Sequence, residues 1–161
     1  MIGRLHHVVL DCREPAAVAG FYSELLGQPI TYQSDDWVVV AANDASSGLA
    51  FQLAPDHQPP TWPDPVVPQQ YHLDVMVEDV AAAGPRVLAL GATKLDGEDV
   101  YADPAGHPFC LVKRPHWAPP IPPGVDPGRE NRKIRTEASR IPHAGPDSYP
   151  FRKGGRTVRR T

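Results

Sequence analysis

The chain repeats one pattern of residues, first from His7 and again from His72. Tyr22 follows the first histidine by 15 residues, Val87 follows the second by 15, and a leucine stands 18 residues after each histidine. Repetition of this kind predicts two supersecondary units that cannot bury their apolar faces alone and therefore pack together. With 161 residues, 41% of them hydrophobic, the chain can form that shared core but not a second full domain.

The first unit is expected to be a strand, a helix and three more strands. Residues 5–12 are rich in strand-forming side chains, and Pro15 then suits the first position of a helix. Apolar residues recur at helical spacing until Gly27, which supplies a stop. Three extended segments follow, separated by the turn-forming stretches SDD and NDASSG, at about 29–33, 37–42 and 49–54.

The second unit begins after a proline-rich connector, residues 55–70. The run YHLDVMV predicts a strand, Asp79 is placed to cap a helix, and Gly91 is placed to end it. Pro85 within this helix favours a kink or a short first turn. Three further strands are expected near 93–95, 99–101 and 108–113. The predicted fold class is therefore α+β, with βαβββ modules at about 5–54 and 71–113 in a domain of residues 1–113.

The remainder of the chain, residues 114–161, has a different composition. It contains 9 prolines and few large apolar residues, so burial cannot offset the entropy of ordering it, and we expect a disordered tail. From Lys113 onward there are 12 basic and 4 acidic side chains, a net charge of +8, against −11 for the rest of the chain. Tail and body should therefore attract each other. The acidic body would repel nucleic acid, and no aromatic residues are regularly interleaved with the basic ones, so nucleic acid is not the expected partner.

The sequence also indicates where in the cell the protein is located. Its apolar runs are far shorter than the roughly 20 residues that span a bilayer, and its N-terminus lacks a signal-peptide pattern, so we expect no membrane contact and a cytoplasmic location. Cys12 and Cys110 fall in strand-like runs, and we expect both to be reduced and buried.

The two units resemble the vicinal oxygen chelate superfamily. The first opens on HHVVLDCREPAAVAGFYSELLG and the second closes on VYADPAGHPFCLV, while the connector WPDPVVPQQYHLD is similar to a largely uncharacterised glyoxalase-like branch. The resemblance covers residues 5–113. It implies the glyoxalase/bleomycin-resistance/dioxygenase fold, in which a curved sheet from each module faces the other around a cavity for a small molecule.

The resemblance further implies metal ligands on the first and last strands of each module, here at His7, Gln52, His72 and Cys110. Imidazole and thiolate suit Zn, Ni or Fe, but the glutamates typical of active members are absent, and hard ions such as Mn prefer carboxylates. Other interpretations stay open: His7 hydrogen-bonds within the fold, Gln52 bridges strands, and Cys110 packs in the core. A nucleophilic role for Cys110 is disfavoured, because no adjacent basic residue would lower its pKa.

Two further groups of residues are candidates for the site. His72 and Asp74 lie on the same face of their strand, so they either orient each other as a catalytic pair or form a plain surface pair. The ligand is expected to contact Gln52 and three aromatic residues, Trp37, Trp62 and Tyr101. Trp62 lies in the connector, where it either covers the cavity as a lid or pins the connector down.

These observations leave more than one function open. The first is a lyase, isomerase or dioxygenase in which a divalent metal (Zn, Ni, Mn or Fe) polarises a substrate carbonyl. The second is a metal-free protein that sequesters an aromatic compound, as resistance members of the superfamily do. Such members often form homodimers with cavities at the subunit boundary, whereas two modules in one chain can make their own. A third interpretation is a protein-interaction module that uses the tail.

Overall fold

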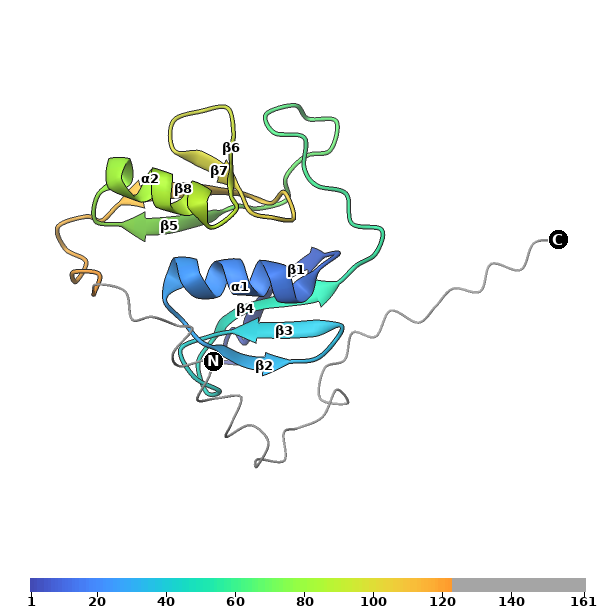
Figure 1. Ribbon diagram of the computed structural model, residues 1–161. Helices are drawn as coiled ribbons and strands as arrows, with labels where there is room; N and C mark the ends of the chain where they lie inside the picture. The colour runs from blue at the N-terminus through green and yellow to red at the C-terminus, as the bar shows by residue number, and fades with distance from the viewer. Residues whose placement is uncertain (123–161) are drawn as a thin grey trace.

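The computed structural model of the protein describes residues 1–122, which form two βαβββ modules (Figure 1). The first contains β1 (His7–Cys12), α1 (Pro15–Leu26), β2 (Ile30–Gln33), β3 (Trp37–Val40) and β4 (Gly48–Leu53). The second contains β5 (Leu73–Val77), α2 (Val80–Ala89), β6 (Thr93–Lys94), β7 (Val100–Ala102) and β8 (Pro108–Lys113). The predicted α+β class and the repeated βαβββ order are confirmed.

Each module builds its own four-stranded mixed sheet. The strand order is β1-β4-β3-β2 in the first sheet and β5-β8-β7-β6 in the second. The first and last strands of a module are parallel neighbours, with His7 opposite Gly48 and Leu73 opposite Phe109, while the other pairs are antiparallel. Residues on the first and last strand of a module can therefore contact one another directly.

Local signals set the ends of both helices. Pro15 opens α1, and Gly27 closes it in a left-handed conformation, with φ of 62°, that glycine adopts readily. The Asp79 side chain accepts a hydrogen bond from the backbone N–H of Ala82 at the start of α2, as predicted. Helix α2 runs through Pro85 and ends at Ala89, slightly before the glycine expected to end it.

The cap at Asp79 gives a first testable prediction. Replacing Asp79 with alanine removes the acceptor for the Ala82 N–H and should lower the free energy of unfolding by about 1 kcal/mol. Urea denaturation would measure the change, with Asp44→Ala, an exposed loop aspartate, as the matched control. Equal unfolding midpoints for the two variants would show that the cap does not stabilise α2.

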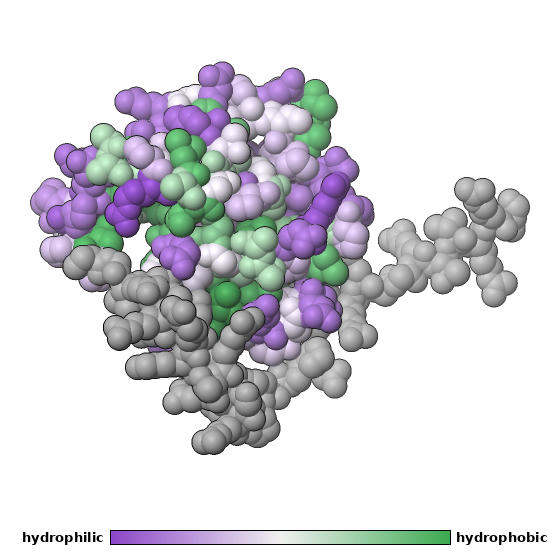
Figure 2. Space-filling view, viewed as in Figure 1, coloured by the Kyte–Doolittle hydropathy of each residue, from purple (hydrophilic) through white to green (hydrophobic). Residues whose placement is uncertain are grey.

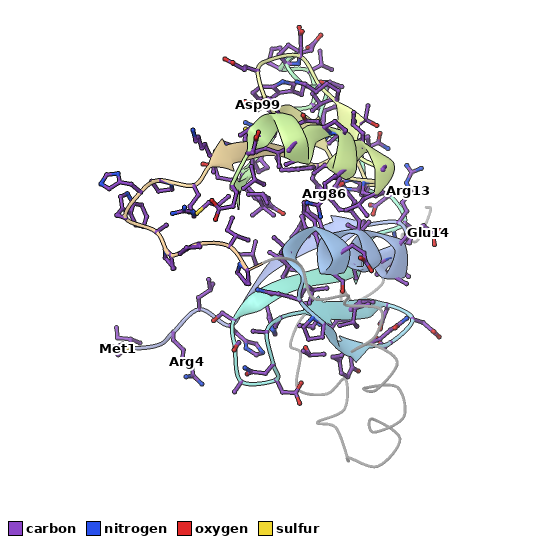
Figure 3. The ribbon with its side chains drawn as sticks, turned by 60° about the vertical axis from the view of Figure 1, so that its left-hand side comes forward. Met1, Arg4, Arg13, Glu14, Arg86 and Asp99 are labelled. Carbon is purple, nitrogen blue, oxygen red and sulfur yellow. The ribbon has the colours of Figure 1, made fainter. Side chains whose placement is uncertain are left out.

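The two modules share one core. The ring of Tyr22 in α1 stacks on Phe51 in β4, with centroids 5.4 Å apart. The same helix contacts the second module, because the ring centroids of Phe21 and Tyr22 lie 5.8 Å and 6.5 Å from that of Phe109 in β8. In Figure 1, α1 lies over β3 and β4 and below the second sheet. Figure 3 shows both helices on the same side of the molecule, with Arg86 between them.

A buried ion pair lies at the junction of the modules. The Asp103 carboxylate, whose side chain is 0% exposed, accepts hydrogen bonds from the backbone N–H groups of Ala105 and His107 and from His107 Nδ1, at 2.8–3.0 Å. His107 Nε2 lies 3.0 Å from the carbonyl oxygen of Asp11 in β1. Both partners of the ring are pure acceptors, so only the doubly protonated imidazolium satisfies both contacts. The second module thereby holds the first strand of the first module.

The environment of His107 agrees with this protonation state. Burial by itself lowers the pKa of His107, but the hydrogen bond and charge of Asp103, together with the Asp11 carbonyl, raise that pKa above its ordinary value of 6.5. The fold therefore favours the protonated form of His107.

The connector and the segment after β8 are fixed by polar contacts. The indole N–H of Trp62 donates to the carbonyl of Asp96 at 2.7 Å, and Arg13 donates to the carbonyl of His57 at 3.0 Å. After β8, Arg114 pairs with Glu78 at 2.8 Å. The segment expected to be a disordered tail thus begins with residues in contact with the second module, and its remainder, 123–161, lies outside the described residues.

The surface of the described part is mixed in character. In the view of Figure 2, hydrophilic side chains dominate the outline of the second module, and hydrophobic ones reach the surface across the middle of the molecule. Within residues 1–122, neither helix has the length and apolar character needed to cross a membrane.

Candidate functional site

Each sheet has one face that packs on the helix of its module and one face turned away, which we name the open face. In the first sheet, Leu10 and Phe51 pack in the helix-side core, and in the second sheet Phe109 and Leu111 do so. Because side chains alternate along a strand, the residues next to these point to the open faces. The open faces therefore carry most of the residues that were predicted from the sequence to be functional.

The open face of the first module brings Trp37 and Gln52 together. Gln52 in β4 lies opposite Trp37 in β3 and opposite Asp11 in β1, and all three side chains are half-buried. In the next row of the sheet Ala50 stands between Val9 and Val39, and Ala50 is 0% exposed. An amide, a carboxylate and an indole thus border a floor of small apolar residues. Such a surface suits a flat molecule that carries a hydrogen-bonding oxygen.

His7 shares this open face but not this position. It lies opposite Gly48, four residues from Gln52 along β4, which is roughly 13 Å at the usual rise of a strand. Its ring contacts that of His6, with centroids 3.8 Å apart, and burial together with His6 lowers the pKa of His7. The imidazole is therefore neutral at pH 7. Its Nδ1 is buried without a hydrogen-bond partner in the described part of the chain.

The open face of the second module gathers three potential metal ligands. His72 and Asp74 form the predicted pair, with Nε2 and Oδ1 3.4 Å apart, and their side chains are 43% and 60% exposed. Cys110 in β8 lies opposite Asp74 in β5. One ligand atom from each of the three residues lies within 4.8 Å of the other two.

The two cysteines have different surroundings. Cys12 is buried as expected, and desolvation is the main cause that raises its pKa to about 12. Cys110 is half-buried on the open face, where burial and the carboxylates of Asp74 and Asp99 raise its pKa, opposed by Lys94. The Cys110 thiol is therefore protonated at neutral pH and is a poor nucleophile by itself.

Two of the predicted ligand contacts lie elsewhere. Tyr101 is 5% exposed and stacks on Phe109 on the helix side of its sheet, with its hydroxyl beside Gly84. Trp62 pins the connector to Asp96, one of the two roles considered for it. Neither residue belongs to an open face.

Two residues on or near these faces were not among the residues predicted from the sequence. Asp11 has the same alternation as His7 and Val9 along β1, so the strand pattern could have revealed it. Asp99 could not be found in this way, because it lies in a turn, with φ of 57°, and approaches Cys110 only through the fold.

The four predicted metal positions do not form one group in the described part of the chain. Among the described histidines, cysteines and acidic residues, His7 is not part of the group formed by His72, Asp74 and Cys110. The strand register supplies a reason. In the second module, the last-strand residue opposite Asp74, two positions after His72, is Cys110. In the first module, the last-strand residue opposite Val9, two positions after His7, is Ala50, which has no ligand atom.

Comparisons with known proteins agree with this architecture. Residues 7–112 match the family model described as the glyoxalase-like domain. No curated protein matches the chain.

Several solved structures are similar to this one. A glyoxalase-related enzyme from Fulvimarina pelagi has a TM-score of 0.54 and 19% identity, over 77% of this chain and 96% of that chain. A glyoxalase/bleomycin resistance protein/dioxygenase family enzyme from Burkholderia phytofirmans PsJN has a TM-score of 0.53 and 16% identity, over 69% and 98%. A genomically encoded fosfomycin resistance protein from Listeria monocytogenes has a TM-score of 0.52 and 17% identity, over 72% and 97%. At these identities the likeness concerns the fold alone.

Proposed function

The chain belongs to the glyoxalase-like domain family, within the vicinal oxygen chelate superfamily, and we propose that it binds a small aromatic or carbonyl-bearing molecule. The observation that carries the proposal is the placement of Trp37 beside Gln52 on the open face of the first module. Its relatives of known structure include both enzymes and a resistance protein, by their descriptions. Binding of a small molecule is the property that these two kinds of protein share.

The proposed contacts follow from the chemistry of the two side chains. The indole of Trp37 offers a flat apolar surface for an aromatic ring, a contact worth about 0.5 to 1.5 kcal/mol beyond area burial. The amide N–H of Gln52 donates to a carbonyl oxygen, and such a bond contributes about 0.5 to 1.5 kcal/mol. Ala50 and Val39 form the next row of the sheet and add small apolar side chains beside these two groups. The cavity between the modules and the homodimer remain predictions.

On the open face of the second module, His72 is the group we expect to move a proton from a molecule that reaches it. Asp74 lies 3.4 Å from its Nε2 and would hold the ring in one tautomer, leaving Nδ1 to accept a proton from the carbon next to a carbonyl. Gln52 cannot take this part, because an amide does not titrate in the useful range.

Metal-free sequestration is the second candidate, and one observation favours it. Ala50 stands where the second module has Cys110, so the set of four metal positions implied by the family is incomplete. Sequestration requires only shape and stacking, which the open face of the first module supplies by itself.

The proposal predicts the behaviour of two variants. With phenylacetaldehyde as the probe, Trp37→Leu and Gln52→Ala should each weaken binding about tenfold, because each removes an interaction worth about 1.4 kcal/mol. Ligand-detected NMR would measure the dissociation constants. Trp117→Leu is the matched control, since Trp117 is 75% exposed in the segment after β8. Unchanged affinity in both site variants, with their folds intact by circular dichroism, would refute the proposed binding surface.

The same samples separate the two functions. In deuterated water, an enzyme-like protein should speed the exchange of the α-protons of phenylacetaldehyde, and His72→Asn should abolish that effect. Binding without exchange would leave sequestration as the function.

A further inference from the structure

We propose that the protein binds one divalent cation entirely within its second module, through His72, Asp74 and Cys110, with Zn²⁺ as the preferred ion. This site is separate from the ligand surface at Trp37 and Gln52. It also differs from a site that takes ligands from both modules, because it uses the carboxylate of Asp74 and does not use His7.

The strand geometry places the three donors together. His72 and Asp74 are two residues apart and therefore point to the same face, while Cys110 projects from the neighbouring strand opposite Asp74. At Zn–ligand distances of about 2.0 to 2.3 Å, two ligands of one tetrahedral ion lie about 3.3 to 3.8 Å apart. The His72–Asp74 distance of 3.4 Å is already in that range. The other distances among the three ligand atoms are at most 4.8 Å, and the side chains of His72 and Asp74 are exposed.

Among residues 1–122, the charges around Cys110 are mainly negative. Asp74 and Asp99 raise the pKa of the thiol, and Lys94 opposes them. The Lys94 ammonium is engaged elsewhere, since it donates to three carbonyls of its own hairpin and lies 5.0 Å from the centre of the Tyr101 ring. A bound cation would neutralise the carboxylates and convert the Cys110 thiol to thiolate, with release of its proton to solvent.

The donor types select the ion. Imidazole nitrogen, carboxylate oxygen and thiolate sulfur together suit Zn²⁺, whereas Mg²⁺ and Ca²⁺ prefer sites made of oxygen alone. Three protein ligands leave a fourth tetrahedral position open, and the exposure of His72 and Asp74 makes that position accessible to water or to a ligand oxygen.

The test uses the full chain without an affinity tag, reduced and freed of metal with EDTA. We expect one Zn²⁺ per chain by elemental analysis after dialysis, with release of about one proton at a pH where the free thiol is protonated. Co²⁺ should give a thiolate-to-metal charge-transfer band in the near ultraviolet. Asp74→Asn should weaken Zn²⁺ binding at least tenfold, and Cys110→Ser should remove the band.

His7→Asn is the decisive comparison, because a site shared between the modules would lose its metal in this variant while the proposed site would keep it. Thermal melts in EDTA establish that each variant is folded. Absence of stoichiometric Zn²⁺ in the wild type, loss of binding in His7→Asn, or unchanged binding in folded Asp74→Asn would each overturn the proposal. None of these results would affect binding of phenylacetaldehyde at Trp37, so the two proposals fail separately.

Discussion

Replacing Asp103 with alanine should lower the free energy of unfolding by about 3 to 5 kcal/mol, as when one partner of a buried ion pair is removed. The variant would leave the imidazolium of His107 and two backbone N–H groups buried without the acceptor that they share. Urea denaturation followed by circular dichroism measures the loss through the unfolding midpoint.

Asp74→Ala is the matched control, because Asp74 also pairs with a histidine but is 60% exposed. That substitution should cost less than about 1 kcal/mol in metal-free protein. A similar loss in both variants would contradict the special role of the buried pair.

The pH dependence of stability gives a second check. Folding raises the pKa of His107 above 6.5, so its stabilisation is complete below that pH and is lost as the pH rises through the folded value. The advantage of the wild type over His107→Asn should therefore shrink with rising pH.

Phe109→Ala should also destabilise the protein by about 3 to 5 kcal/mol, because it opens a cavity in the centre of the shared core. The side chain is 0% exposed and its ring lies against Phe21, Tyr22 and Tyr101. Since these rings come from both modules, the loss should appear as one cooperative unfolding transition at lower urea.

The control for Phe109 is Trp117→Ala, which removes a large aromatic side chain that is 75% exposed and should change stability by no more than about 0.5 kcal/mol. Two separate transitions in Phe109→Ala, with the first module unfolding at the wild-type midpoint, would show that the modules have independent cores.

Much of this fold could be predicted because its signals are local. Pro15, Gly27 and Asp79 act through backbone geometry and short-range hydrogen bonds, so their positions in the sequence fix the ends of α1 and the start of α2. The strand predicted at 108–113 is observed with the same bounds. The end of α2 was less clear, because helix ends differ by a residue or two according to the last hydrogen bonds.

The site was harder to predict because it depends on register. The repeat from His7 and His72 says how far each helix follows its first strand, but not which residue of the last strand lies beside each histidine. The hydrogen-bond register of β1 with β4 and of β5 with β8 shows that Ala50, and not Gln52, occupies the position in the first module that Cys110 occupies in the second. Tyr101 was misleading for a related reason. All residues of the short strand β7 are buried, so alternation did not reveal which of its faces meets the helix.

The hydrogen bond from His107 to the Asp11 carbonyl also bears on self-association. Strand β1 is at the edge of its sheet, and an edge strand offers free backbone groups to which a strand from another molecule can add. The imidazole from the second module occupies one of those groups. If the junction opens, that edge is exposed, so variants that weaken the Asp103–His107 pair should aggregate through β-sheet pairing as well as unfold more easily.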